Sequence, residues 1–326
     1  MDSPTRSFLV LVGVSATLAA YAACGSIAYV LIPLLGLSPG ALARLGLACL
    51  LPAIAFAALL ATSVGLAART LGRQLSASRR LAHRVRALAL PRPPELLAAA
   101  KASGLEGRVT LVDSDERVSF AYGFLVPRVA IGRGFLESLT AEELRAALEH
   151  ERYHVRHLDP LRALLAKTLA EAFFFLPALE DLRRGYVAGR ELEADRRAER
   201  VWGRRALLGA LLKALGEQSR GSPAAVSLAD PEVMEARISR LETGQAPALG
   251  LIGVPSMLVS ALGVGSCLLL FVAAVAGLGG RSALANLAIA ELGSGGVPLS
   301  LACVAPDVAV STSIYRLLSR RARRPL

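Results

Sequence analysis

Three long apolar runs without a charged residue place the strongest constraint on how this chain can fold. Residues 8–37, 45–68 and 248–280 contain no Asp, Glu, Lys or Arg. About 20 helical residues cross the roughly 30 Å hydrocarbon core of a bilayer, so each run is long enough to span it. The turn signal GLSPG at residues 36–40 separates the first two runs. We therefore expect a transmembrane helical hairpin over 1–68 and another transmembrane helix over 248–280.

Both ends of the chain leave a second interpretation open. Ala22-Ala23-Cys24 resembles a lipoprotein cleavage site, which would make the first run a cleaved signal peptide. The run continues well past Cys24, however, which favours the transmembrane interpretation. Towards the other end, residues 297–318 are apolar but are interrupted by two prolines and two charges. We treat 281–326 as a candidate fourth transmembrane helix followed by a basic tail.

The placement of arginines predicts the orientation of the chain in the membrane. Seven arginines follow the second run, whereas the turn before that run holds only Arg44. These seven are Arg69, Arg73, Arg79, Arg80, Arg84, Arg86 and Arg92. Positive residues accumulate on the cytoplasmic side, so the segment 69–247 is expected to be cytoplasmic, at a bacterial-type inner membrane. Five further arginines between 316 and 324 favour a cytoplasmic C-terminus and an even number of spans.

The basic stretch 69–92 is predicted to be a juxtamembrane linker that faces anionic lipid headgroups. No aromatic residue lies among its arginines to stack on bases, so direct nucleic-acid binding is not expected. The composition agrees with a membrane protein, since 54% of residues are apolar and 19% are charged. Soluble domains have about 45–50% and about 25%. The four cysteines form no C-x-x-C pair, which argues against a disulfide framework or a cysteine zinc site.

Residues 93–247 are the part able to form a water-facing domain. Segments 108–113, 118–123 and 128–132 are rich in Val, Ile, Phe and Tyr between turn residues, which predicts short strands. Thr140 and Glu143 have the spacing of a capping box at the start of a helix, and Pro160 is expected to end that helix. The predicted fold class is α+β, with several helices and a small β-sheet.

The predicted helix carries the pattern His150-Glu151-Arg152-Tyr153-His154. Positions i and i+4 lie on one helix face, so both imidazoles can bind a single metal ion. Glu151 is offset by one residue, where it can take a proton from metal-bound water. A catalytic zinc site has three protein ligands and one open position for that water. The sequence therefore predicts one zinc ion per chain, bound by His150 and His154, with Glu151 as the general base.

The third ligand is expected from a downstream helix at about 187–201. Glu191 and Asp195 are four residues apart and share a face, so Glu191 could bind zinc while Asp195 accepts the free ring N–H of a ligand histidine. A solvated helix with Glu–Arg pairs is the alternative interpretation of this charged segment taken alone. Its coupling to the upstream H-E-x-x-H motif favours the ligand interpretation.

The residues between about 110 and 245 resemble the BlaR/MecR-type integral membrane zinc metallopeptidases, whose best-known members are beta-lactam-sensing antirepressor proteases. The similar segments are GFLVPRVAI (123–131), HERYHVRHLDP (150–160), FFFLP (173–177), RELEAD (190–195) and MEARISRL (234–241). The resemblance implies zinc ligation by His150, His154 and Glu191, catalysis by Glu151, and the E-x-x-x-D pattern of gluzincins. It also implies a multi-span membrane protein with a mainly helical zincin-like domain in the cytoplasm.

The chain departs from that family in three places. Arg152 and Tyr153 occupy positions that are usually apolar or small, and Ala194 replaces a frequent cysteine. Only 46 residues follow Gly280, so the beta-lactam sensor domain is not expected, nor is beta-lactam sensing.

Several aspects of function stay open at this stage. Tyr122, Tyr153, Tyr186 and Arg190 are candidates for stabilising the oxyanion or contacting substrate, and the strand at 118–123 could offer its edge to an extended substrate. The expected activity is endopeptidase cleavage of a protein or peptide on the cytoplasmic side, in signalling, with a transcriptional repressor or a membrane protein as the substrate. Alternatives are an HtpX/Ste-like quality-control protease and a non-catalytic transducer with a zinc-bound docking domain. The sequence does not predict the oligomeric state.

Overall fold

The computed structural model describes residues 3–25, 47–215, 231–244 and 252–293. The chain divides into two compact units. Unit 1 contains residues 1–8, 68–168 and 182–251, and unit 2 contains residues 9–67, 169–181 and 252–326.

A four-stranded mixed sheet forms one part of unit 1. Its strands are β1 (Ala89–Leu90), β2 (Val109–Val112), β3 (Ser119–Tyr122) and β4 (Arg128–Gly132), in the spatial order β1-β2-β4-β3. β2 and β4 are parallel, whereas β1 and β3 run antiparallel to their neighbours. The three predicted strands correspond to β2, β3 and β4. The two-residue β1 was not predicted.

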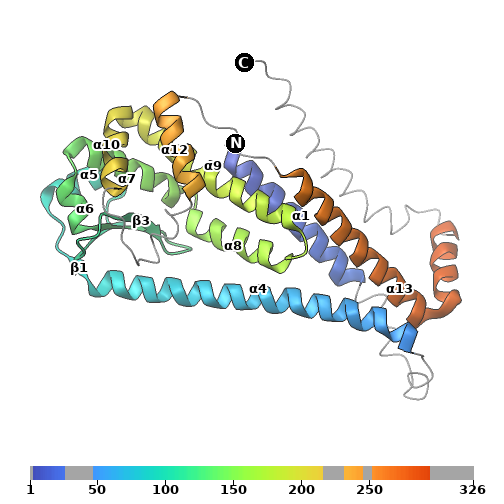
Figure 1. The fold of residues 1–326 in the computed structure, drawn as a ribbon. Helices are drawn as coiled ribbons and strands as arrows, with labels where there is room; N and C mark the ends of the chain where they lie inside the picture. Colours follow the sequence, from blue (N-terminus) through green and yellow to red (C-terminus); the bar gives the residue numbers. More distant parts are fainter. Residues whose placement is uncertain (1–2, 26–46, 216–230, 245–251, 294–326) are drawn as a thin grey trace. The chain divides into compact units, whose positions relative to one another are not determined.

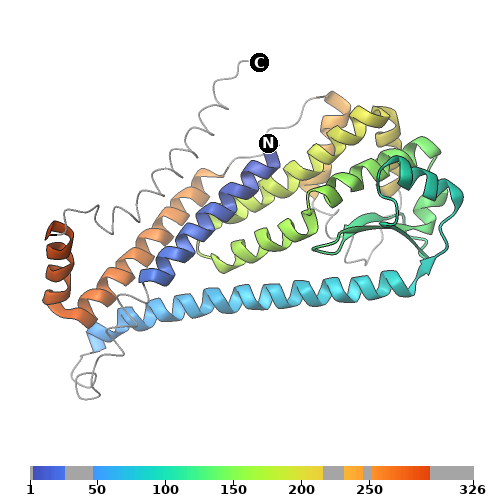
Figure 2. The same ribbon diagram turned by 180° about the vertical axis from the view of Figure 1, so that it is seen from behind.

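Alternating side chains bury both faces of this sheet, as their period of two requires. Val109, Val129 and Ile131 face a core formed with α5 (Pro94–Ala102), α6 (Arg133–Ser138), α7 (Ala141–Arg156) and α10 (Arg204–Leu215). Val112 and Ala130 face the other way, onto Leu81, Ala82 and Val85 of α4 (Leu47–Ala87). The sheet therefore lies between α4 and the α5–α7 layer, as Figure 1 shows from one side and Figure 2 from behind.

The helix α7 begins where the sequence predicts. Thr140 Oγ1 accepts a hydrogen bond from the Glu143 amide at 3.3 Å, and the Thr140 amide donates to Glu143 Oε2 at 2.7 Å. These reciprocal bonds satisfy two backbone donors that a helix start leaves free. The helix ends at Arg156, and Pro160 instead lies in the first turn of α8 (Asp159–Ala172). This first turn tolerates proline because its amides have no partner within the helix.

Two further helices, one of them α9 (Pro177–Trp202) from residue 182 onward, complete the surroundings of α7 in unit 1. The 26-residue α9 contains the predicted helix at 187–201, and α12 (Pro231–Thr243) follows α10 in the described chain. Ala146 of α7, Ala198 of α9 and Leu241 of α12 belong to one buried apolar cluster. Small side chains at Ala146 and Ala198 let α7 and α9 approach each other.

Unit 2 contains the apolar helical segments. They belong to α1 (Ser3–Gly25), the first part of α4, and α13 (Val254–Gly293). Within this unit the rings of Phe56 and Phe271 lie 5.6 Å apart, and the Ala178 amide donates to Ser260 Oγ at 3.0 Å.

Two described helices are long and apolar enough to cross a membrane, judged by length and composition: Leu51–Ala87 and Val254–Ala273. They overlap the second and third predicted spans. The apolar helix Pro4–Ala20 is shorter, and the rest of the first run, from residue 26, lies outside the described residues. The candidate fourth span at 297–318 also lies outside them.

Candidate metal centre

Helices α7 and α9 bring the predicted ligand atoms together. His150 Nε2 lies 3.1 Å from His154 Nε2, and Glu191 Oε2 lies 3.5 Å from the first and 3.7 Å from the second. All three residues are buried, with at most 8% of their surface exposed. The two histidines meet because they are one helical turn apart, and α9 supplies the carboxylate from the facing side.

These spacings fit a small four-coordinate cation. Zinc binds imidazole nitrogen and carboxylate oxygen at about 2.0–2.2 Å. Two ligands on a tetrahedron of that radius are therefore about 3.3–3.6 Å apart. Of the observed separations, 3.5 Å lies within this range, and 3.1 and 3.7 Å lie just outside it. These three residues could therefore hold a divalent metal ion.

Two carboxylates orient the imidazoles from behind. Asp159 Oδ2 lies 2.7 Å from His154 Nδ1, and Asp195 Oδ1 lies 2.8 Å from His150 Nδ1, close but not aligned as a hydrogen bond. A carboxylate at Nδ1 favours the tautomer in which Nε2 is free to bind a metal, and it raises the basicity of the ring. The structure thus puts Asp195 beside a predicted ligand histidine, as expected from the E-x-x-x-D spacing.

Arg237 of α12 contacts these carboxylates in turn. Its Nε and Nη2 donate to the two oxygens of Asp195 at 2.7 and 2.8 Å, and its Nη1 lies 3.8 Å from Glu191 Oε2. Asp195 has no exposed surface and Arg237 has 4%. A guanidinium matches a carboxylate with two parallel hydrogen bonds, so it fixes both the position and the plane of Asp195.

A strained backbone residue lies between His154 and Asp159. Leu158 has a φ of 53°, and among the described residues no other non-glycine residue has a positive φ. This conformation costs a residue with a β-carbon about 1–2 kcal/mol. It lets the chain leave α7 and start α8 with the Asp159 carboxylate beside His154, an example of strain retained next to a functional group.

Charge explains the protonation of the cluster. Burial disfavours a charged imidazole, but Glu191 and Asp159 outweigh this effect and raise the pKa of His154 to about 10. Burial would raise the pKa of Glu191, whereas His154, His150 and Arg190 hold this pKa well below its usual value. Without a bound cation, His154 therefore keeps a proton at neutral pH beside an ionised Glu191. A metal ion would have to displace that proton.

The surrounding charges also favour a dication. Three buried carboxylates and two buried guanidiniums are linked to the two imidazoles directly or through one another: Asp159, Glu191, Asp195, Arg190 and Arg237. The buried Glu151 follows His150 in sequence and adds a fourth carboxylate. With neutral imidazoles, this group carries a net charge of minus two. A divalent cation neutralises that charge in a region where an uncompensated charge is costly.

The four predicted oxyanion or substrate residues lie in different surroundings. Tyr122 faces α4 with Val85, on the face of the sheet opposite α7, so the structure does not bring it to the cluster. Tyr153 is buried, with its ring centroid 5.9 Å from that of His154. The Tyr186 hydroxyl lies 3.4 Å from Asp159 Oδ1, and Arg190 Nε lies 3.3 Å from Glu191 Oε1.

Two residues of the site had no role assigned from the sequence. Asp159 and Arg237 both lie in segments that resemble the family, but the sequence predicts no contact for either of them. The sequence signal for Asp159 is its position five residues after His154 and directly before Pro160, which lies in the first turn of the next helix. Arg237 is 42 residues from Asp195, so local spacing gives no sign of this contact.

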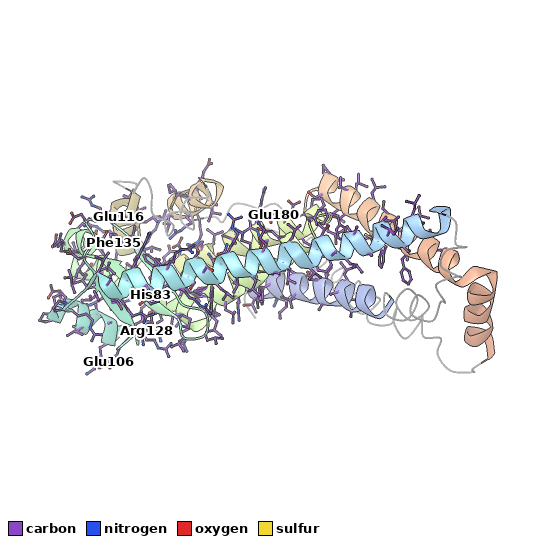
Figure 3. The ribbon with its side chains drawn as sticks, turned by 90° about the horizontal axis from the view of Figure 1, so that it is seen from below. His83, Glu106, Glu116, Arg128, Phe135 and Glu180 are labelled. Carbon is purple, nitrogen blue, oxygen red and sulfur yellow. The ribbon has the colours of Figure 1, made fainter. Side chains whose placement is uncertain are left out.

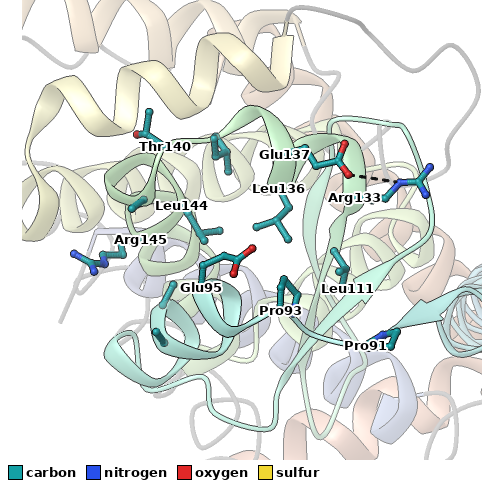
Figure 4. A pocket seen from close by; sticks show the side chains of 14 residues that line it. Pro91, Pro93, Glu95, Leu111, Arg133, Leu136, Glu137, Thr140, Leu144 and Arg145 are labelled. Carbon is teal, nitrogen blue, oxygen red and sulfur yellow. Dashed lines mark ion pairs between the residues drawn. The ribbon is translucent and has the colours of Figure 1, made fainter.

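Other histidines and cavities lie apart from this site. His157 caps α7 and packs its ring 4.1 Å from that of Tyr153, and His83 is exposed on α4 (Figure 3). A cavity of about 580 Å³ lies among the starts of α5 and α7, α6 and β2 (Figure 4). Arg133 and Glu137 pair at its rim, and none of the ligand residues line it.

Comparison with known proteins relates the chain to membrane peptidases. A stretch of 48 residues is 48% identical to the "Protease HtpX homolog" of Aquifex aeolicus (strain VF5), covering 15% of this chain and 16% of that relative's length. No solved structure matches the chain. The family model described as "BlaR1 peptidase M56" matches residues 49–241, more than half of the chain. Together these similarities support a membrane metallopeptidase in general terms. The chain belongs to the BlaR1 peptidase M56 family.

Proposed function

We propose that this protein is a membrane-embedded zinc endopeptidase whose site is formed by His150, His154, Glu191 and Glu151. The observation that carries the proposal is the convergence of two Nε2 atoms and one carboxylate oxygen at separations of 3.1 to 3.7 Å. A structural zinc site is normally closed by four protein ligands. Three ligands with an acid in the adjacent position instead favour catalysis.

A zinc ion held by these ligands would supply Lewis-acid chemistry, lowering the pKa of a water molecule and polarising the scissile carbonyl. Glu151 would take the proton from that water and deliver it to the leaving amine. Its buried position, one residue after a ligand on α7, is suited to this role. Asp159, Asp195 and Arg237 would keep the histidines and Glu191 in place during turnover.

We assign stabilisation of the oxyanion to the α9 side of the site rather than to Tyr122. Burial and Asp159 raise the pKa of Tyr186, so its hydroxyl stays protonated and able to donate. The guanidinium of Arg190 is buried beside Glu191 and keeps its charge. Either group could meet negative charge that develops on the substrate carbonyl.

Substrate is proposed to bind along β3. This strand is an edge of the described sheet, and Ala121 belongs to the core that it shares with α7. An extended peptide could add to that edge through main-chain hydrogen bonds. The zincin-like arrangement of sheet and helices, with the E-x-x-x-D pair of gluzincins on α9, is part of the same proposal.

The wider biology follows the same reasoning from sequence. We propose a multi-pass protein of a bacterial-type inner membrane with residues 93–247 in the cytoplasm, preceded by the basic linker 69–92. Its substrate would be a cytoplasmic protein, a repressor or a membrane protein, cleaved in signalling. The second candidate is the HtpX/Ste-like quality-control protease expected from the sequence, and the short match to a "Protease HtpX homolog" supports its protease part.

Metal analysis and casein cleavage by the full-length protein in detergent test the proposal. We expect about one zinc per chain in the wild type. Glu151→Gln should keep the zinc and lose cleavage, and Glu191→Ala should lose both. Glu193→Ala is the matched control, because Glu193 lies on the same helix but pairs with Arg196 and Arg200. Unchanged cleavage in Glu151→Gln would overturn the proposal, because cleavage would then not arise at this site, and a wild type that holds zinc without cleaving would favour the non-catalytic transducer.

A further inference from the structure

The turn between β3 and β4 exposes two large apolar side chains. Leu125 is 80% exposed and Val126 is 63% exposed, and Leu125 is more exposed than any other large apolar residue of the described chain. Isolated exposed leucines are ordinary, whereas two adjacent apolar side chains at the tip of a turn form a small apolar patch.

The turn is built to hold these side chains outward. Gly123 has a φ of 87°, and a β-carbon there would lie 3.1 Å from the carbonyl oxygen of Val126. At the other side of the turn, Pro127 is fully buried. Gly123 and Pro127 therefore fix the two ends of the turn that carries Leu125 and Val126.

Strand topology places basic residues at the same end of the sheet. β2 and β4 are parallel, with Val109 opposite Val129, so the residues before them lie side by side. These residues include Arg108 and Arg128, which are both exposed. The 123–127 turn leads directly into Arg128, which is labelled in Figure 3. Glu106 and Lys101 are also exposed nearby in sequence.

The opposite end of the sheet is marked by Leu88, whose carbonyl accepts a hydrogen bond from Asp113, just after β2. Leu81 and Val85 of α4 pack against one face of the sheet, so α4 lies along that face and its C-terminus is at the Leu88 end of the sheet. The turn therefore points back along α4 towards residue 68, as Figure 1 shows for these elements. From Arg69 to Ala87, α4 contains six arginines and no acidic residue.

We propose that Leu125 and Val126 insert into the interface of an anionic lipid bilayer, with Arg108 and Arg128 on lipid phosphates. Leucine or valine beside arginine suits this region, where apolar side chains enter the acyl boundary and guanidiniums remain at the headgroups. The same α4 helix carries a segment apolar enough to cross a membrane. This anchor would hold the free edge of β3 close to the membrane surface, and it does not depend on the metal or on Glu151.

Tryptophan fluorescence of the full chain in vesicles tests the anchor. The protein has one tryptophan, so Trp202→Phe gives a dark parent whose fold is checked by circular dichroism. Leu125→Trp is then compared with Leu88→Trp, an exposed position at the opposite end of the sheet. The vesicles contain phosphatidylcholine brominated near the glycerol, with or without phosphatidylglycerol.

We expect Leu125→Trp to emit at shorter wavelength and to be quenched several-fold more than Leu88→Trp. Adding Arg108→Glu and Arg128→Glu should reduce that quenching most in the vesicles with phosphatidylglycerol. Equal, weak quenching of the two tryptophan variants would overturn the proposal. So would a wavelength shift that is unaffected by brominated lipid, because the tip would then contact protein.

Discussion

Replacing Arg237 with methionine would test whether a buried arginine holds the metal site together. The change keeps the unbranched aliphatic stem of the side chain but removes the guanidinium and with it both hydrogen bonds to Asp195. Because Asp195 has no exposed surface, water cannot replace the two lost hydrogen bonds. The remaining polar neighbour of the Asp195 carboxylate is then His150, whose Nδ1 lies 2.8 Å away. The carboxylate must then depend on His150 alone or take up a proton.

The magnitude follows from the two lost bonds. Hydrogen bonds to a charged group contribute about 1.5–3 kcal/mol each, and breaking a buried ion pair from one side costs about 3–5 kcal/mol. The two bonds together amount to about 3–6 kcal/mol, which overlaps the second figure, so we expect a loss of about 3–5 kcal/mol in the free energy of unfolding. For a domain of this size, that loss lowers the melting temperature by about 6–20 °C.

Thermal unfolding of the chelated full-length protein in detergent measures this effect, and zinc titration measures its consequence for the site. Arg240→Met is the matched control, because Arg240 lies on the same helix and pairs with Glu199 away from the ligands. It should lose stability but keep the affinity for zinc, whereas Arg237→Met should lose both. The double variant Arg237→Met, Asp195→Asn should be less destabilised than Arg237→Met alone, since the unpaired charge is gone. A loss below about 1 kcal/mol, as at an exposed pair, or full additivity in the double variant, would refute the reasoning.

Three further predictions concern the ligands and the start of α7. Zinc affinity should rise with pH below about 10, by about tenfold per pH unit for each proton displaced, because His154 has a pKa of about 10 and binds metal only when neutral. Calorimetry in buffers of different ionisation enthalpy counts the protons released on zinc binding. An affinity that does not change with pH would contradict this prediction. Asp159→Asn should weaken zinc binding about 10–100-fold by removing the charge behind His154, whereas the exposed Asp113→Asn should leave it unchanged. Gly185→Ala should stabilise α9 by up to about 1 kcal/mol, since its β-carbon meets open space. Gly209→Ala should lack that gain, because its β-carbon would collide with the Glu143 carboxylate that caps α7. Loss of this cap should lower the free energy of unfolding by about 1 kcal/mol more. Equal melting temperatures for the two alanine variants would contradict this.

The local features of unit 1 could be predicted from sequence because their causes are local. The capping box at Thr140 needs only a spacing of three residues, and the meeting of His150 with His154 needs only the helical repeat. The strands β2, β3 and β4 follow from short apolar segments between turn residues. The β1 strand could not be predicted in this way, since two residues show no alternation.

The contacts that complete the site join residues distant in sequence, and for this reason they could not be predicted from the sequence. Arg237 reaches Asp195 across 42 residues, and nothing in either segment specifies the other. The orientation of β3 has the same difficulty: alternation puts Phe120 and Tyr122 on one face, but only the packing against α4 shows which face it is. Tyr122 was therefore a reasonable candidate from sequence that the fold directs away from α7. The length of α4, which continues to Ala87, also depends on its packing under the sheet.

The measurement that tests the central claim most directly is reconstitution of activity with zinc. The full-length protein is stripped with a chelator, zinc is added in known amounts, and casein cleavage is followed beside Glu151→Gln at equal zinc content. We predict that cleavage rises in proportion to bound zinc, levels off at about one ion per chain, and is absent from Glu151→Gln throughout. Cleavage that is independent of zinc, or equal in Glu151→Gln, would contradict the assignment of this site as the hydrolytic centre.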